Sequence, residues 1–302
     1  MLNVPGFTIS EQLHQGSRAV VYRATREEDG LAVVLKAPRD PRPPLAEASR
    51  LQAELRLGRL VEHPAVIRYH ELIWDDHRPV LVIEDSGGQA LSEHLAAGPL
   101  ALPRFLELAL ALAEGLAAIH QRGIIHRDIN PANVIFDEQT GGVKIIDLGI
   151  AALLVHAGEA QVTSPQQIEG TLRYISPEQT GRMNRSVDHR TDLYSLGVTL
   201  YEMLAGRVPF EAQDPLELVH AHLARTPPSL AESGLPEVVV AIVSRLLAKN
   251  PEERYQSADG LAEDLRRCQQ TLTGDEQVPS FTLGERDVSS RFALPQRLYG
   301  RE

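Results

Sequence analysis

The stretch GIIHRDINPANVIFDEQTGGVKIIDLG, from Gly123 to Gly149, decides how this chain of 302 residues is interpreted. It contains Asp128, Asn133 five residues later, and Asp147 beyond a short hairpin that we expect around Gly141-Gly142. Two carboxylates and an amide oxygen are hard ligands of the kind that Mg²⁺ prefers. A carboxylate that is free of metal can accept the proton of a hydroxyl group. The spacing therefore predicts one site that combines a metal with a base.

The same stretch resembles the eukaryotic-type protein kinases. Residues 126–133 match their catalytic loop, and Asp147-Leu148-Gly149 is a variant of their Asp-Phe-Gly motif. Either motif alone also fits two loops with chance acidic residues, whereas both in this order favour the kinase family. The resemblance implies an α+β, bilobal protein kinase fold with a small β-rich N-lobe and a larger α-helical C-lobe. It also implies ATP and Mg²⁺ as cofactors, bound between the lobes.

The lysine and glutamate of the family have matches upstream. Lys36 ends the run VVLK on a predicted strand over 31–37, and Glu54 lies on a helix predicted over 44–61. In the family this lysine contacts the ATP α/β-phosphates and pairs with the helix glutamate. Glu47 is a second, weaker candidate for the ion pair.

Further site residues follow from the resemblance alone. Asp128 is the base that orients and deprotonates the hydroxyl, while Asn133 and Asp147 hold the metal. Gly16, in the phosphate-covering loop, and Val21, on the strand pattern that follows it, are implied to bind the nucleotide. Ile83 is the gatekeeper, and the backbone of Glu84, Asp85 and Ser86 forms the hinge that meets the adenine.

The chain departs from the family pattern at Leu148, a conservative change in packing terms, and at two further places. Where the phosphate-covering loop has G-x-G-x-x-G, residues 14–19 keep only Gly16. Because glycine permits close backbone approach to phosphate, we expect a stiffer loop or one held further away. Asn130, counted among the catalytic residues, replaces a lysine that donates to the γ-phosphate. Loss of this charge predicts weaker stabilisation of the transferring group.

Three positions further along also match the family. Residues 170–178 resemble the end of an activation segment, with Ser176-Pro177-Glu178 in place of Ala-Pro-Glu. Asp192 matches the buried helix residue that supports the catalytic-loop backbone, and Arg254 matches the buried partner of Glu178.

The activation segment also offers candidate phosphorylation sites. Thr163 and Ser164 lie inside it, and a phosphate there could pair with Arg127. An ordinary polar loop fits these residues equally well.

Periodicity predicts strands first and helices later. Beyond the elements above we expect a strand over 78–85, a strong helix over 103–121, and helices over 193–205, 215–224, 236–248 and 258–272. The kinase domain is expected over 7–272, with an N-lobe of about 7–85 and a C-lobe of about 89–272. His220 and His222 are two apart on a predicted helix, so they make a poor metal pair and are expected at the surface.

Composition excludes several other classes. The chain has 30 Lys+Arg and 41 Asp+Glu, a net charge of −11, which argues against a nucleic-acid partner. A single cysteine, Cys268, excludes an internal disulfide and fits a reducing, cytoplasmic location. No stretch is long and apolar enough to span a membrane, and the first residues do not resemble a signal peptide.

A closer resemblance narrows the family. The run from Glu169 to Gly206 and the ending RLYGRE (297–302) resemble large bacterial signalling proteins. Those begin with a serine/threonine kinase domain and continue into an AAA-type ATPase, a GAF sensor and often a histidine kinase. The resemblance implies that 273–302 is a linker toward covalently linked ATPase and sensor domains outside this chain. The group also has asparagine at the position of Asn130, which favours activity.

These observations predict a serine/threonine protein kinase that transfers the ATP γ-phosphate to hydroxyls of a protein substrate in bacterial signalling. Two alternatives remain open at this stage. The first is a nucleotide-binding pseudokinase that acts as a regulatory or docking module, suggested by the loop at 14–19 and by Asn130. The second is a small-molecule phosphotransferase, which generally lacks the Ser-Pro-Glu segment end and the Arg254 partner.

Overall fold

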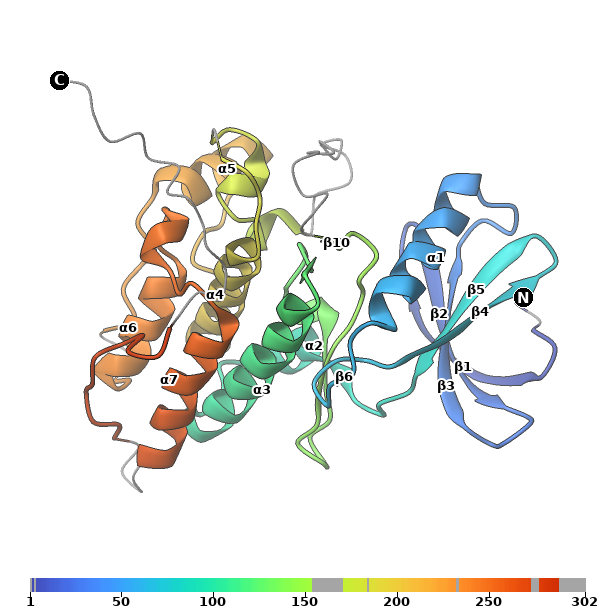
Figure 1. The fold of residues 1–302 in the computed structure, drawn as a ribbon, viewed down its shortest axis with the longest axis horizontal. Helices are drawn as coiled ribbons and strands as arrows, with labels where there is room; N and C mark the ends of the chain where they lie inside the picture. Colours follow the sequence, from blue (N-terminus) through green and yellow to red (C-terminus); the bar gives the residue numbers. More distant parts are fainter. Residues whose placement is uncertain are drawn as a thin grey trace.

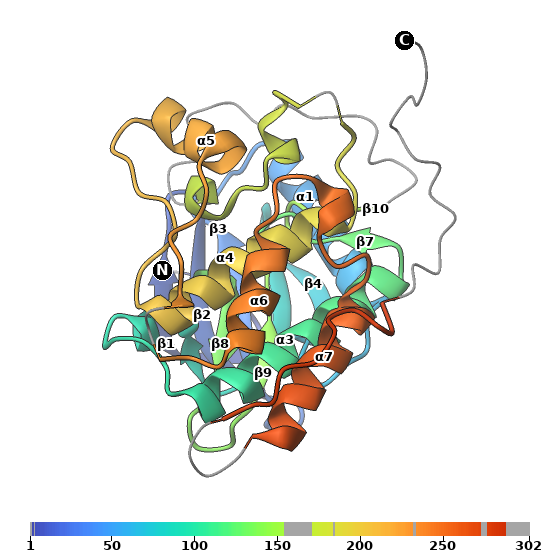
Figure 2. The same cartoon turned by 90° about the vertical axis from the view of Figure 1, so that its left-hand side faces the viewer.

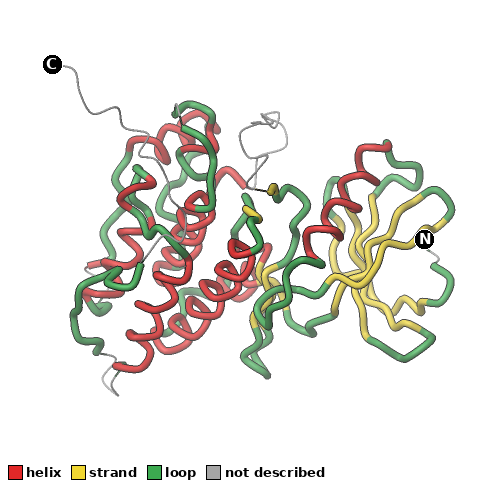
Figure 3. Tube along the Cα trace, in the orientation of Figure 1, coloured by secondary structure: helices red, strands yellow, loops and turns green. Residues whose placement is uncertain are grey.

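The chain folds into a sheet lobe and a helical lobe that meet along one side (Figure 1). The computed structural model describes residues 2, 4–153, 171–183, 185–231, 234–272 and 277–287. Figure 3 shows the long strands gathered in the first lobe and most of the helices in the second lobe, which also holds the short strands. This is the α+β bilobal kinase architecture that the sequence predicted.

The first lobe is an antiparallel sheet with the spatial order β1-β2-β3-β5-β4. Its strands are Phe7–Gln15 (β1), Ala19–Arg26 (β2), Ala32–Pro38 (β3), Tyr69–Asp75 (β4) and Arg78–Glu84 (β5). Alternate residues of β3 and β5 point to opposite faces, and both faces are apolar, so these central strands are buried along nearly their whole length. The helix α1 (Leu45–Gly58) covers one face and carries Glu54 inward.

The second lobe is built around two long helices, α3 and α4. Figure 2 shows them with the other helices gathered around them. The helices are Leu91–Leu95 (α2), Leu102–Gln121 (α3), Arg190–Ala205 (α4), Pro215–Ala224 (α5), Glu237–Leu246 (α6) and Ala258–Thr271 (α7). Both α3 and α4 are apolar on most sides and largely buried, as expected for helices at the centre of a lobe.

Short strands flank and support the segment from Gly123 to Gly149. The hairpin of β8 (Val134–Phe136) and β9 (Val143–Ile145) pairs with β6 (Gln89–Ala90), and β7 (Ile124–Ile125) pairs with β10 (Ala152–Leu153). The loop 126–133 therefore runs between β7 and β8. Asp147 follows directly after β9, beside that loop.

The predicted helices lie within three residues of their predicted ends, because apolar spacing and proline or glycine boundaries define them well. The short helix α2, the strands β1 and β4, and the two-residue strands β6, β7 and β10 were not predicted. Most of β1 is exposed and most of β4 half-buried, so neither has a clear apolar pattern. The expectation for His222 was wrong: its side chain is fully buried, while His220 is exposed.

Part of the predicted linker packs on the helical lobe. Residues 277–287 lie against α6 and α7, with Val278 buried in the core and Asp287 almost fully enclosed. Residues 273–276 and 288–302 lie outside the described part of the chain. Among the described residues, no helix is long and apolar enough to cross a membrane.

Candidate active site

Three charged side chains from distant parts of the sequence meet where the lobes join. Lys36 Nζ lies 3.0 Å from both carboxylate oxygens of Glu54 and 2.9 Å from Oδ1 of Asp147. Lys36 and Glu54 are buried, so the ion pair is shielded from water. The predicted Lys36–Glu54 pair is confirmed, whereas Glu47 lies near Arg50 instead, at 3.9 Å.

Electrostatics favours the charged forms of Lys36 and Asp147. Burial opposes the charged form of Lys36, but Glu54 and Asp147 outweigh it and raise the lysine pKa. Burial also opposes ionisation of Asp147, yet the Lys36 charge and hydrogen bonds lower its pKa to about 2. Burial raises the pKa of Glu54, and Lys36 works against that shift. Asp147 is therefore an anion at neutral pH, as a metal ligand must be.

Two asparagines hold Asp128 from both sides. Asn133 Nδ2 donates to the Asp128 backbone oxygen and to Oδ2, both at 2.9 Å. Asn130 Nδ2 donates to the same backbone oxygen at 3.1 Å and to Oδ1 at 2.9 Å. The Asn130 oxygen accepts from the Ala132 amide, starting a short 3₁₀ turn at Pro131. The carboxylate is fixed in one orientation by these bonds.

The Asp128 carboxyl is also a stronger base than a free aspartate. Burial raises its pKa, and the nearby negative charge of Asp147 raises it further. His126 and the two asparagine amides act in the opposite direction. The net upward shift suits a group that must accept a proton.

The catalytic loop is supported from behind by Asp192 on α4. Its oxygens accept from the backbone amides of His126 at 2.8 Å and Arg127 at 2.7 Å, and the His120 ring contacts it at 2.8 Å. The predicted support of the loop backbone by Asp192 is confirmed. Arg127 has a φ of 70°, an uncommon conformation that these bonds hold in place.

One residue that sequence reasoning missed connects the triad to the loop after β9. Tyr69, the first residue of β4, accepts a hydrogen bond from the Leu148 amide at 3.2 Å and contacts Glu54 Oε1 at 3.5 Å. In the sequence, a tyrosine in a weak apolar run gives no signal of such a role.

The predicted nucleotide-covering residues lie over the same face of the sheet. Val21 pairs directly with Lys36 across β2 and β3, and directly paired residues share a face of a sheet. Gly16 lies in the turn between β1 and β2, where its amide donates to the Ala19 oxygen. The loop is therefore closed as a tight hairpin despite its lost glycines.

The predicted hinge follows β5. Ile83 is buried at the end of that strand, and Glu84 and Ser86 are half-buried beyond it. The Glu84 side chain lies 2.9 Å from Lys144 Nζ and also accepts from the Arg68 amide, so it ties the hinge to the second lobe. The Glu84 amide donates to the Arg68 oxygen at 2.9 Å, so an adenine would bind to the remaining backbone groups of residues 84–86.

The donor set fits Mg²⁺. Both amide protons of Asn133 go to Asp128, which leaves its side-chain oxygen as a ligand, and the contacts of Asp147 with Lys36 and Gly149 use only Oδ1. No group of three or more His, Cys, Asp or Glu side chains forms a metal site in the described part of the chain. One carboxylate and one amide suit a cation that shares its remaining ligands with phosphate and water.

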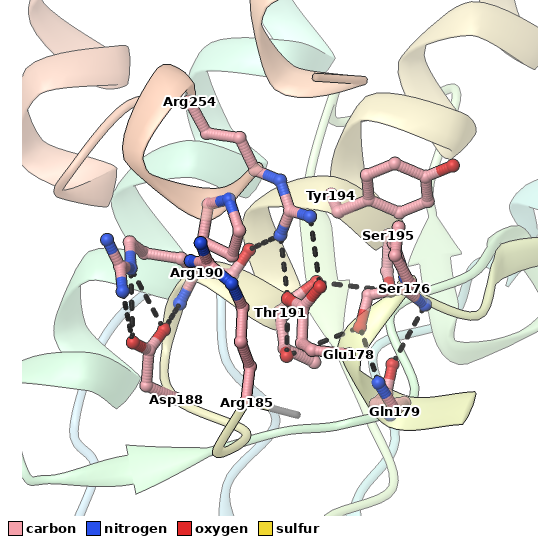
Figure 4. Close-up of polar contacts among 12 residues, drawn as sticks. Ser176, Glu178, Gln179, Arg185, Asp188, Arg190, Thr191, Tyr194, Ser195 and Arg254 are labelled. Carbon is pink, nitrogen blue, oxygen red and sulfur yellow. Dashed lines mark hydrogen bonds and ion pairs between the residues drawn. The ribbon is translucent and has the colours of Figure 1, made fainter. Parts of the chain in front are cut away.

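A buried ion pair anchors the end of the activation segment (Figure 4). The Arg254 guanidinium donates to Glu178 Oε1 at 2.7 Å and to Oε2 at 2.9 Å, and both side chains are fully enclosed. The adjacent Gln179 donates to the Arg127 backbone oxygen at 2.8 Å, linking the segment to the catalytic loop. The predicted Glu178–Arg254 pair is confirmed. Thr163 and Ser164 lie outside the described residues.

The comparison with known protein families agrees with this geometry. Residues 7–265 match the model of the protein kinase domain. The chain belongs to the protein kinase family. The confirmed Lys36–Glu54 pair, the Asp128 loop and the Glu178–Arg254 anchor all lie within the matched part of this kinase domain.

Similar bacterial proteins carry the same family name. The kinase domain is 36% identical over 274 residues to serine/threonine-protein kinase pkn2 of Myxococcus xanthus, covering 88% of this chain and 33% of the relative. It is 35% identical over 271 residues to a probable serine/threonine-protein kinase of Streptomyces coelicolor, covering 87% of this chain and 40% of the relative. It is 36% identical over 225 residues to serine/threonine-protein kinase PknB of Mycobacterium tuberculosis, covering 72% of this chain and 35% of the relative. The chain thus spans between a third and two fifths of these relatives' lengths.

Proposed function

We propose that this kinase domain transfers the γ-phosphoryl group of ATP to a serine or threonine hydroxyl of a protein substrate. The observation that carries the proposal is the complete triad of Lys36, Glu54 and Asp147, together with an Asp128 carboxylate that accepts hydrogen bonds from the Asn130 and Asn133 amides. The relatives named serine/threonine-protein kinases support this choice of hydroxyl.

Each residue has a defined task on this proposal. Lys36, fixed by Glu54, binds the α/β-phosphates, and Val21 and Gly16 cover the nucleotide. Asn133 and Asp147 would hold Mg²⁺, which neutralises phosphate charge when bound. The backbone around Glu84 and Ser86 would bind the adenine.

Asp128 performs the step that needs a base. Its carboxylate accepts a hydrogen bond from the substrate hydroxyl and directs the oxygen toward the γ-phosphorus. The O–P bond to the substrate forms as the bond to ADP breaks, and the hydroxyl proton passes to Asp128. Lys36 offsets the negative charge of the leaving phosphates.

Intact-mass spectrometry of the protein incubated with Mg-ATP and candidate substrates tests the proposal. We expect mass increments of one phosphate with the wild type, and none with Asp128→Ala or Asp147→Ala. Asp259→Ala, an exposed aspartate on α7, is the matched control and should behave like the wild type. Nucleotide-induced thermal stabilisation without any transfer would instead favour the pseudokinase alternative.

The wider setting is part of the same proposal. We infer that the kinase domain spans 7–272 and that 273–302 lead toward covalently linked ATPase and sensor domains. The short share of the relatives that this chain covers is compatible with such a context. The cytoplasmic location, with which the single cysteine is consistent, stays a prediction.

A further inference from the structure

The segment 277–287, which we call the strap, is held on α6 and α7 by side chains from both of its ends. At its start Val278 is buried in the core of the helical lobe. Three residues later the Arg267 guanidinium of α7 lies 4.1 Å from the centre of the Phe281 ring. Burial of apolar side chains therefore stabilises the first half of the strap on this lobe.

Two glycines, one on each partner, allow the second half of the strap to approach closely. A Cβ atom at Gly260, in the first turn of α7, would overlap the side chain and the Cα atom of Asp287. A Cβ atom at Gly284, which has a φ of 72°, would overlap the Arg245 guanidinium. The Gly284 amide also donates to Asp264 Oδ2 at 2.7 Å. This fit on both sides indicates a specific contact with one register.

The Asp287 carboxylate is the polar centre of this contact. Its side chain is 1% exposed, and it accepts from the Gln256 amide at 2.7 Å and from the Ser257 amide and hydroxyl at 2.9 Å. A buried carboxylate is costly unless donors surround it, and here three donors do so. The strap thus fixes the backbone of residues 256 and 257.

Gln256 extends this restraint to the Glu178–Arg254 anchor. Its side-chain amide donates to the Pro251 and Arg254 backbone oxygens at 3.1 and 2.8 Å, and its side-chain oxygen accepts from Arg190 at 3.0 Å. The Arg254 guanidinium in turn donates to the Arg190 backbone oxygen and to Glu178 (Figure 4). One glutamine therefore contacts both backbone segments that hold the guanidinium.

A second set of contacts leads from Gln256 to the catalytic loop. The Gln256 backbone oxygen lies 2.8 Å from Nε2 of His189, whose ring packs edge-on against the His120 ring at 5.4 Å. His120 lies 2.8 Å from Asp192, which supports the loop backbone. The strap is thus connected to both parts of the protein that face the substrate hydroxyl.

We propose that the strap positions the end of the activation segment, with Asp287 as a positioning residue that acts through Gln256 on the Glu178–Arg254 anchor. The inference rests on the proposed function, since the anchor matters for activity only if the domain transfers phosphate. The strap lies outside residues 7–265, so the match to the kinase domain model does not account for it. Withdrawal of the strap would loosen the loop behind Arg254 and lower activity from outside the cleft.

The first test measures hydrogen exchange and needs no activity. In Asp287→Ala, amides within 171–183 and 248–257 should exchange about tenfold faster, while those of the sheet lobe change less. Glu285→Ala, which removes a largely exposed carboxylate of the strap, should leave exchange as in the wild type. Val80→Ala opens a cavity in the separate apolar core of the sheet lobe and should give the opposite pattern, with the sheet lobe affected most.

The second test is kinetic and isolates the coupling. Asp287→Ala should lower kcat/KM for a peptide substrate about tenfold and change KM for ATP less than about twofold, because the Lys36 triad is untouched. Gln256→Ala keeps the backbone amide that Asp287 binds but removes the bonds to the anchor. If Asp287 acts through Gln256, the double variant should lie within about twofold of the weaker single variant.

The outcomes separate this inference from the proposed function. Wild-type transfer combined with equal kinetics for Asp287→Ala and Glu285→Ala would overturn the role of the strap and leave the proposed function intact. Multiplied effects in the double variant would also overturn it, since the two residues would then act independently. If the wild type transfers no phosphate while Asp287→Ala still speeds exchange within 171–183, the proposed function fails and the restraint by the strap stands.

Discussion

Asn130 donates its side-chain amide to Asp128, at 2.9 Å from Oδ1, on the opposite side from Asn133. Protein kinases usually have a lysine at this position, and the resemblance implied that its contact with the γ-phosphate is lost in this chain. In the structure the amide is fully committed, because its oxygen also accepts from Ala132. Compared with the family lysine, Asn130 lacks a positive charge, but it adds a second donor to the Asp128 carboxylate. The Asn130 and Asn133 amides together form the Asp128 clamp.

The first prediction concerns this clamp. Asn130→Ala should lower kcat about tenfold and leave KM for ATP nearly unchanged, because the Asp128 carboxylate loses one of its two fixed donors. Asn130→Lys should also lower kcat, since lysine has no oxygen to accept from Ala132. Steady-state kinetics on a peptide substrate measures both. Gln269→Ala removes an exposed amide on α7 and is the control. If kcat were the same for Gln269→Ala and Asn130→Ala, the proposed effect of Asn130 on Asp128 would be wrong.

The second prediction is a pH dependence with a defined sign. On the proposed mechanism the carboxylate form of Asp128 is the active one, so kcat should fall as the pH drops through its raised pKa. The Asn130 amide stabilises the charged form. Its removal should therefore raise the Asp128 pKa further and move the acid limb of the kcat profile to higher pH. A limb that stays in place in Asn130→Ala would show that another group controls it.

Much of the site was predictable because each key residue lies in or close to a recognisable element. Lys36 lies near the end of an apolar strand, Glu54 lies on the helix that follows, and Asp147 comes after a short hairpin. Fixed spacing along the chain thus carries the positions of these groups. The same holds for Glu178 and Arg254, whose motifs stand out although they are 76 residues apart.

Other features depend on contacts between residues that are far apart in the sequence, and a local sequence pattern does not show such contacts. The Tyr69 hydroxyl meets Leu148 across 79 residues, and it needs a glycine at position 58 to do so. Asn130 could be recognised only as a departure from lysine, since its true partners are set by the path of the loop. His222 was misplaced because its helix packs against Tyr194, which helical spacing alone does not show.

The third prediction follows from His222. Its side chain is fully buried with Nδ1 3.0 Å from the Tyr194 hydroxyl, and burial together with the Lys249 charge lowers its pKa to about 4. The unfolded chain takes up this proton near pH 6.5, before the folded protein does. Folding is therefore destabilised as the pH falls from about 6.5 to about 4, by roughly 2 kcal/mol between pH 7 and pH 5.

Chemical denaturation at pH 7 and pH 5 measures this loss. His222→Gln should remove roughly 2 kcal/mol of the pH-dependent change, whatever its effect on stability at pH 7. His220→Gln, an exposed histidine on the same helix, should leave the change as it is in the wild type. Identical pH dependence in both variants would exclude His222 as the source.

The last prediction concerns the segment 277–287 on the helical lobe. The Asp287 carboxylate accepts from the Gln256 amide at 2.7 Å and from the Ser257 amide and hydroxyl at 2.9 Å. Its side chain is 1% exposed, and Arg245 lies 3.5 Å away. These bonds satisfy donors at the start of α7, where a negative charge also complements the helix dipole.

Asp287→Ala should therefore lower the free energy of unfolding by about 3 kcal/mol, because buried donors and Arg245 lose their acceptor together. Glu285→Ala is the matched control. Its carboxylate is largely exposed and reaches Arg267 only at 3.4 Å, so a change below about 0.5 kcal/mol is expected. Thermal and urea unfolding of both variants measures the two changes in the free energy of unfolding. If Asp287→Ala were as stable as Glu285→Ala, the hydrogen bonds of Asp287 would contribute nothing to folding, and the segment would be held by its apolar contacts around Val278 alone.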